Sequence, residues 1–186
     1  GITVRPIRSM LGSHHLNEVF FDDVAAGPEA VLGGIGEGWA VIRQALAHER
    51  VGIARYARCE RLLSALGREL APHWGALPAS LHAQWARALV QVRVARLLAY
   101  RTVHAQATGE FPDVLASAAR IAVTQCDQSV AEVLFQAIED EALEAGPSAP
   151  LHGAIEDHWR YAQAATVASG TIEVQRMIVS KALLGG

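Results

Sequence analysis

The apolar residues of most of this chain recur with the spacing of amphipathic α-helices. They predict helices over residues 39–70, 80–108 and 112–144, and a fourth helical stretch from residue 153 onward. The fourth stretch should break at Ser169-Gly170 and restart at Thr171, a residue type that often caps a helix. Because the first three helices are long and the loops between them short, the pattern favours an antiparallel four-helix bundle.

The second and third predicted helices each have one face expected to point into the core. On the second helix this face consists of Leu81, Trp85, Leu89, Val92, Ala95 and Ala99. On the third helix it consists mostly of small residues, namely Leu115, Ala119, Ala122, Cys126, Val130, Val133 and Ala137. Since small side chains let a neighbouring helix approach closely, we expect the third helix to be tightly packed.

The N-terminal part of the chain has the pattern of β-strands instead. Residues 2–7 and 17–24 are rich in β-branched and aromatic side chains. Two strands alone are marginal in water, so we expect the rest of their sheet to lie upstream. The predicted fold class is therefore mainly α: an antiparallel four-helix bundle preceded by a fragment of a β-domain. The domains are expected at residues 1–32 (strands) and 33–186 (helices).

Composition excludes several classes of function. The net charge of −3 provides no basic surface for nucleic acid. The chain has no apolar run long enough to cross a membrane and no visible targeting peptide, which favours a soluble, cytoplasmic protein. Cys59 and Cys126 have no Cys or His nearby at metal-ligand spacing, so we interpret both as reduced thiols and predict no metal site.

The glycine-rich stretch at residues 33–38 has two interpretations. A loop that binds a dinucleotide would follow a strand and precede a helix and a second parallel strand, and no such later strand is predicted. A flexible entry to the first helix is the alternative.

Two motifs resemble one known family. The first is Asn17-Glu18-Val19-Phe20-Phe21-Asp22-Asp23-Val24 with Leu32-Gly33 and Gly36-Glu37-Gly38-Trp39. The second is Ser169-Gly170-Thr171-Ile172-Glu173-Val174-Gln175-Arg176 with Leu183-Leu184-Gly185. They resemble, respectively, the end of the middle β-domain and the closing motif of acyl-CoA dehydrogenases, and together the resemblance covers essentially the whole chain.

This resemblance implies FAD as cofactor and α,β-dehydrogenation of an acyl-CoA thioester. It also implies an electron-transfer flavoprotein as electron acceptor and a homo- or hetero-oligomer assembled through the helical bundle. In the family a glutamate removes the α-proton of the thioester. Many members carry this base directly before the Gly-Thr of the closing motif, where this chain has Ser169. Others carry it on the first helix of the bundle before an arginine, which Glu49-Arg50 matches.

The residues themselves also favour Glu49. Ile42, Leu46, Glu49 and Ile53 follow helical spacing, so Glu49 should project from an apolar face. The alternative is a structural ion pair with Arg50 or Arg55. The resemblance gives Arg50 a role in substrate binding.

Four residues near the end of the chain match positions that the family places beside the flavin. These are Ser169, Gly170, Thr171 and Glu173, and the restarted helix should offer free N–H groups to an anion. The alternative is a helix break with a threonine cap, and both interpretations can hold together.

The chain also departs from the family pattern. Residues 61–74 lack the Arg-x-Phe-Gly motif that clamps the flavin pyrophosphate, and residues 139–146 form an acidic run. This run is expected either to repel a pyrophosphate or to be a solvated helix end. Such losses resemble a divergent bacterial branch that includes sterol side-chain dehydrogenases, in which some subunits only complete a shared flavin site. A non-catalytic partner subunit is therefore the alternative function.

A third class of function is a helical bundle that binds a metal or a protein partner. A di-iron bundle needs Glu-x-x-His pairs, and no Glu of this chain has a His three residues later. The segment alone is expected to be folded but inactive.

Overall fold

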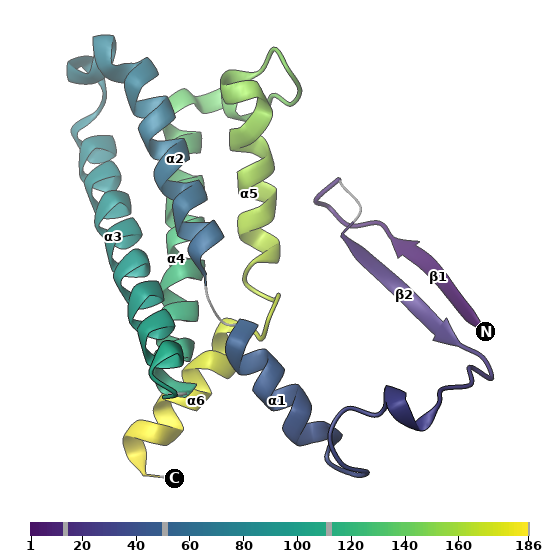
Figure 1. Ribbon diagram of the computed structural model, residues 1–186. Helices are drawn as coiled ribbons and strands as arrows, with labels where there is room; N and C mark the ends of the chain where they lie inside the picture. The colour runs from purple at the N-terminus through teal and green to yellow at the C-terminus, as the bar shows by residue number, and fades with distance from the viewer. Residues whose placement is uncertain (13–14, 50–51, 111–112, 186) are drawn as a thin grey trace. The chain divides into compact units, whose positions relative to one another are not determined.

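The computed structural model describes residues 1–12, 15–49, 52–110 and 113–185. The chain divides into two compact units, Gly1–Glu49 and Arg50–Gly186 (Figure 1). Each unit is described by itself. The domain boundary at residue 32 stays a prediction.

The first unit begins with an antiparallel hairpin. Strand β1 (Ile2–Ile7) pairs with β2 (Leu16–Phe21), with Ile2 opposite Phe21. The apolar side chains of both strands are exposed, including Phe21 at 68%. A short 3-10 helix η1 (Pro28–Ala30) and helix α1 (Gly38–Glu49) follow. The hairpin agrees with the predicted strands, except that β2 ends before Val24.

The second unit is a helical bundle. Helices α2 (Ile53–Leu70), α3 (Ala79–Ala107), α4 (Asp113–Ile138) and α5 (Ala154–Ala164) lie alongside one another, and α6 (Ile172–Leu184) packs against α4 at one end (Figure 1). The 3-10 helices η2 (Ala71–Ala76), η3 (Glu139–Leu143) and η4 (Pro150–Gly153) lie in the connections. The predicted mainly α class and its bundle are confirmed.

The predicted helix over residues 39–70 is wrong in one respect, because it is two helices. Gly52 is the N-cap of α2 and has non-helical torsion angles, with φ −89° and ψ 27°. A Cβ atom at Gly52 would lie 3.2 Å from the Val123 side chain of α4. A glycine is therefore well suited to this close approach, and glycine is also a poor helix former. Similarly, the predicted helix over 112–144 ends at Ile138, because Glu139 has a positive φ of 48°.

Helix α4 is the centre of the bundle and packs against α2, α3, α5 and α6. Its buried residues go beyond the predicted stripe and include Thr124 and Asp127. On α3 the predicted inward face needs one correction, because Leu89 is 39% exposed while Ala88 is buried at 1%. The core includes Leu63, Leu66, Val92, Val130, Leu134 and Ile155. In the part of the chain that the structure describes, no helix is long and apolar enough to cross a membrane.

Candidate functional site

The turn between α5 and α6 has an unusual backbone. Ser169 and Gly170 both have left-handed torsion angles, with φ of 56° and 85°. Thr171 then returns to an extended conformation and caps α6, which confirms the predicted break and restart. A non-glycine residue in the left-handed region costs roughly 1–3 kcal/mol, and such strain is common at functional sites. The turn therefore presents a defined backbone surface.

Gln175 supports this turn from within α6. Its side chain is 2% exposed, and its Nε2 donates a 3.5 Å hydrogen bond to the carbonyl oxygen of Ser169. A Cβ atom at Gly170 would lie only 2.6 Å from the same Nε2. Position 170 therefore requires glycine for two reasons, its positive φ and the close approach of Gln175.

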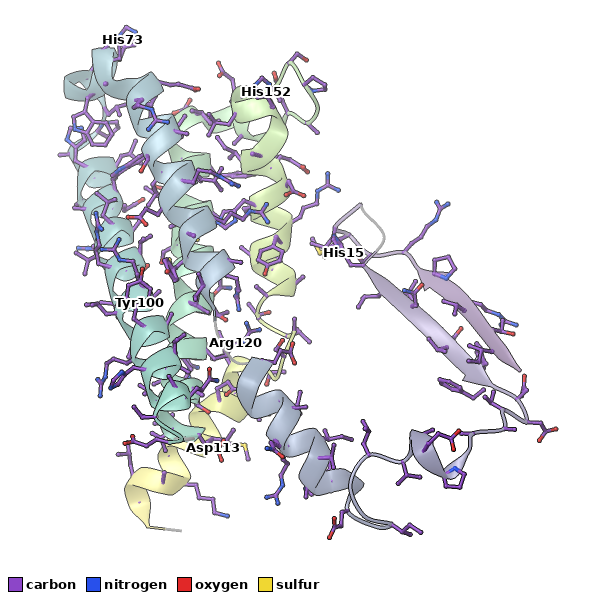
Figure 2. The ribbon with its side chains drawn as sticks, in the orientation of Figure 1. His15, His73, Tyr100, Asp113, Arg120 and His152 are labelled. Atoms are coloured by element: carbon purple, nitrogen blue, oxygen red, sulfur yellow. The ribbon has the colours of Figure 1, made fainter. Side chains whose placement is uncertain are left out.

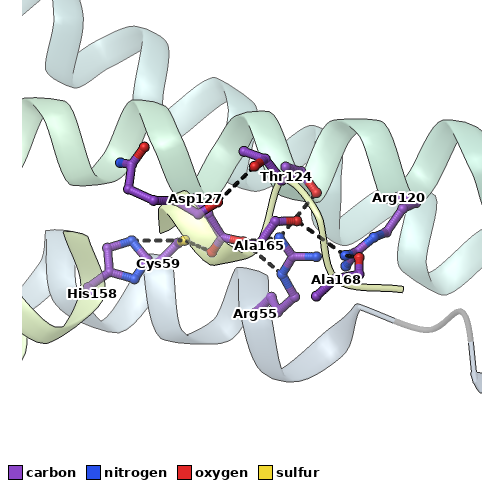
Figure 3. A network of polar contacts seen from close by, with 10 residues as sticks. Arg55, Cys59, Arg120, Thr124, Asp127, His158, Ala165 and Ala168 are labelled. Carbon is purple, nitrogen blue, oxygen red and sulfur yellow. Dashed lines mark hydrogen bonds and ion pairs between the residues drawn. The ribbon is translucent and has the colours of Figure 1, made fainter. Parts of the chain in front are cut away.

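Arg120 of α4 holds the start of the same turn. Its guanidinium donates to the carbonyl oxygens of Ala165, at 3.2 Å, and Ala168. The last carbonyl groups of a helix lack partners within the helix, and an arginine is well suited to bind them. Figure 2 shows Arg120 at the end of the bundle that carries α6, and Figure 3 shows its two bonds. The turn is thus fixed from both sides, by Arg120 and by Gln175.

The N-terminus of α6 already satisfies its own donors. The hydroxyl oxygen of Thr171 accepts a hydrogen bond from the Val174 N–H at 3.3 Å, and Ile172 donates to Thr166. The pKa of Glu173 is lowered by a hydrogen bond from its own N–H and then by the Thr171 hydroxyl. The expectation of free N–H groups for an anion is therefore wrong, because these groups have acceptors. The turn suits an uncharged part of a ligand better than a phosphate.

Glu49 is the last residue of α1, and its side chain is exposed in the first unit. Ile42 and Leu46 share its helical face, as predicted. Ile53 does not continue that face, because it is the first residue of α2 in the other unit. Arg50 lies outside the described residues, so its role in substrate binding stays a prediction.

Arg55, one of the two alternative partners of Glu49 beside Arg50, is engaged elsewhere. The Nε of Arg55 donates to Asp127 Oδ2 at 2.7 Å, and its Nη2 donates to the Thr124 hydroxyl at 3.1 Å (Figure 3). Asp127 is fully buried at 0% exposure. A buried carboxylate needs a partner of this kind, since leaving it unpaired would be strongly destabilising.

The Asp127 carboxylate also belongs to a polar cluster that spacing along the chain did not suggest. The Cys59 thiol donates to Asp127 Oδ1 at 3.3 Å, and His158 Nε2 lies 3.8 Å from the Cys59 sulfur. All three side chains are completely buried. One signal was available: Asp127 follows Val123 and precedes Val130 and Leu134 at helical spacing, so it stands within an apolar stripe.

The acidic run at residues 139–146 takes the second of its two expected forms. Glu139, Asp140 and Glu141 are exposed on the short helix η3, and Ala142 is the buried residue of that helix. The run is thus a solvated helix end.

The fold and these motifs have known counterparts. Residues 36–184 match the family model described as "Acyl-CoA dehydrogenase, C-terminal domain". The chain therefore belongs to the acyl-CoA dehydrogenase family, as the C-terminal domain.

Several relatives are similar along the whole chain. Acyl-CoA dehydrogenase FadE34 of Mycobacterium tuberculosis is 27% identical over 189 residues, which include all of this chain and 25% of the relative. The solved structure of the Tcur3481-Tcur3483 steroid ACAD superposes with a TM-score of 0.90 at 25% identity, over all of this chain and 49% of that one. The ChsE4-ChsE5 complex of M. tuberculosis gives a TM-score of 0.85 at 24% identity, over all of this chain and 50% of that one. The chain thus spans half or less of these proteins.

Proposed function

We propose that the protein containing this chain catalyses FAD-dependent α,β-dehydrogenation of an acyl-CoA thioester. The observation that carries this proposal is the family match over residues 36–184, which includes both Glu49 and the turn at Gly170. The family itself supports an oxidoreductase in full-length relatives. The chain spans only part of such relatives, so we assign the activity to the whole protein and expect the segment alone to be inactive.

In this proposal Glu49 is the base that removes the α-proton. It is the remaining acidic candidate because Ser169, at the other family position, has no group that is basic at neutral pH. Ile42 and Leu46 on the same face of α1 would exclude water from the carboxylate once the face is covered. Arg50 is proposed to contact the substrate. The bound flavin supplies the acceptor for the β-hydride.

The residues around Gly170 fit an uncharged part of FAD. Gly170 has a left-handed backbone and no side chain, so a planar ring could approach the turn closely. Thr171 and Glu173 lie at the adjoining helix start, where the Glu173 carboxylate can accept a hydrogen bond from a ribose hydroxyl. The donors of α6 are already in use, so we place the pyrophosphate elsewhere.

The proposed partners follow from the same assignment. They are an acyl-CoA substrate, an electron-transfer flavoprotein as acceptor, and further subunits docked on the bundle. Helix α3 supports the last proposal, because Val90, Val94 and Leu97 are 61%, 44% and 62% exposed on it. Because the solved relatives include a steroid ACAD, a thioester with a steroid ring system is the first substrate to try.

The proposal is tested by anaerobic titration of the full-length flavoprotein with acyl-CoA thioesters, among them a steroid side-chain thioester. The flavin absorbance should bleach in the wild type, and Glu49→Gln should bleach at least about 1000-fold more slowly, at the upper part of the usual range for a general base. Glu37→Gln, another exposed glutamate of the same unit, is the control and should bleach normally. Rapid bleaching in Glu49→Gln would refute Glu49 as the base.

A second candidate is a non-catalytic subunit that completes a flavin site shared with a different chain. Two observations favour it: Ser169 replaces an acidic residue, and one solved relative is the ChsE4-ChsE5 complex. Purification of the full-length protein with and without the product of the neighbouring gene separates the two candidates. Stoichiometric FAD and turnover without the partner support the first, and FAD retention only in the complex, with Glu49→Gln fully active, supports the second.

A further inference from the structure

A thiol, a carboxylate and an imidazole meet in the centre of the bundle. They belong to Cys59 of α2, Asp127 of α4 and His158 of α5, so three different helices supply them. Each residue is 0% exposed, and the three potential ligand atoms all lie within 4.8 Å of one another (Figure 3). The family assignment does not use this cluster.

The spacing of these atoms matches a tetrahedral metal site. A zinc ion bonds sulfur at about 2.3 Å and nitrogen or oxygen at about 2.0–2.2 Å, so two ligand atoms of different elements stand roughly 3.5 Å apart. The Cys59 sulfur lies 3.3 Å from Asp127 Oδ1 and 3.8 Å from His158 Nε2. All three ligand atoms lie within 4.8 Å of one another, so they would have to close by up to about 1 Å around a zinc ion. We infer that Cys59, Asp127 and His158 form a zinc-binding site that links α2, α4 and α5.

The chemistry of the donors selects the metal. Calcium and magnesium prefer oxygen ligands alone, whereas a mixed set of sulfur, nitrogen and oxygen suits zinc. Histidine binds zinc as the neutral imidazole. One thiolate and one carboxylate balance the charge of the zinc ion and leave the positive charge of Arg55 on the far oxygen of Asp127. One buried water would complete the coordination.

Arg55 is placed to support such a site from outside. It binds Oδ2 of Asp127 at 2.7 Å, which leaves Oδ1 facing Cys59 and available to the metal. Ligating carboxylates are commonly oriented by a hydrogen bond of this kind. The Thr124 hydroxyl fixes the other end of the Arg55 guanidinium at 3.1 Å.

Hydrogen bonds alone account for the cluster less completely than a bound zinc ion does, because they leave His158 with poor partners. The single proton of the Cys59 thiol is used by Asp127 Oδ1, so the 3.8 Å contact with His158 is a hydrogen bond only if Nε2–H donates to the Cys59 sulfur. Nδ1 of His158 has no hydrogen-bond partner among the described residues. A completely buried imidazole with poor partners costs free energy, and a bond from Nε2 to zinc offsets that cost.

The first test is the metal content of the full-length protein. The protein is incubated with zinc chloride, dialysed exhaustively against metal-free buffer and measured by mass spectrometry of the elements. We expect about one zinc per chain. Cys59→Ser should reduce zinc to background. His73→Gln is the control, because His73 is exposed and is not in the set of three. Zinc at background in the wild type would overturn the inference, as would equal zinc in both variants.

Cobalt substitution reports the thiolate directly and does not depend on the variants folding. The wild type and His73→Gln should show a sulfur-to-cobalt charge-transfer band that excess zinc removes. If Cys59→Ser does not fold, as judged by circular dichroism, the wild-type spectrum alone decides. A cobalt complex without that band would assign any bound metal to surface histidines and overturn the site.

Discussion

Asp127 in α4 and Glu49 in α1 have the same sequence pattern and different surroundings. Each is an acid among apolar residues at helical spacing, and the pattern alone would mark both as unusual. Asp127 is completely buried against Arg55, in the centre of the bundle. Glu49 is exposed at the end of its helix in the first unit.

The difference shows what spacing along one helix leaves undetermined. It predicts which face a side chain occupies, but it does not predict what a second helix places opposite that face. The basic partner Arg55 makes Asp127 a structural charge, whereas we propose Glu49 as a proton acceptor. The first unit carries the proposed catalytic base, and the bundle carries the buried ion pair.

The largest expected effect comes from removing the buried acid. Asp127→Ala leaves Arg55 without its carboxylate in the core, so unfolding free energy should fall by about 3–5 kcal/mol. Asp157→Ala removes an exposed partner of Arg58 and should cost less than about 1 kcal/mol. Glu49→Gln should change stability by less than about 0.5 kcal/mol. Urea denaturation of the full-length protein, followed by circular dichroism, measures all three.

If Asp127→Ala lowers the free energy of unfolding no more than Asp157→Ala does, Asp127 is not a structural charge. Its contrast with Glu49 is then lost. A large destabilisation by Glu49→Gln would have the same consequence, because it would make Glu49 a structural charge as well.

Two leucines test whether neighbouring helices, rather than helical spacing alone, determine which side chains are buried. Leu134 of α4 is 0% exposed, so Leu134→Ala should cost about 2–5 kcal/mol through lost contacts and a cavity. Leu89 of α3 has the helical spacing of a core residue but is 39% exposed. Leu89→Ala should therefore cost about 1 kcal/mol or less. Equal losses in the two variants would show that Leu89 is buried in the assembled protein, at an interface on α3.

The turn before α6 can be compared with a similar glycine elsewhere. Gly109 and Gly170 both have positive φ, 78° and 85°, but a Cβ atom meets nothing within 4 Å at Gly109. Gly109→Ala should cost about 1–2 kcal/mol for the left-handed backbone alone. Gly170→Ala should cost more, because it also displaces the Gln175 side chain. Thermal unfolding of the two variants measures the difference. Equal shifts of the unfolding midpoint would show that the Gln175 side chain does not restrict position 170.

The smallest effect concerns Glu173 at the start of α6. Its pKa is lowered in the folded protein, so its ionised form stabilises the fold above the unfolded value of 4.5. This stabilisation should disappear as the pH falls from 4.5 through the folded pKa, where the folded and unfolded proteins bind the proton equally. Thus Glu173→Gln should be slightly less stable than the wild type at pH 7 and equal to it in acid. An NMR titration that gives Glu173 a carboxyl pKa above 4.5 would contradict the hydrogen bonds from its own N–H and from the Thr171 hydroxyl.

Much of the architecture could be predicted because helical periodicity extends over long stretches. The bounds of α3 and the restart of α6 at Thr171 came close to the structure, since Pro78, Gly109 and Thr171 are strong local signals. The division of the first predicted helix at Gly52 was missed. A Cβ atom at Gly52 would lie 3.2 Å from the Val123 side chain on another helix, and periodicity contains no information about such an approach.

The candidate site was predictable in part. The motif located the turn at Ser169-Gly170 and contains Gln175, which supports it, but Arg120, which also holds the turn, comes from α4. The cluster of Cys59, Asp127 and His158 joins three helices separated by up to 99 residues, which no short spacing rule detects. In each case the missing information is tertiary.

The central claim is that Glu49 removes the α-proton, and exchange of that proton tests it most directly. The full-length flavoprotein, with its partner subunit if one is needed, is incubated with acyl-CoA in deuterium oxide, and deuterium at the α-carbon is followed by NMR. The account predicts rapid incorporation in the wild type and in Glu37→Gln, and none above the uncatalysed rate in Glu49→Gln with FAD still bound. Wild-type incorporation in Glu49→Gln would contradict the account.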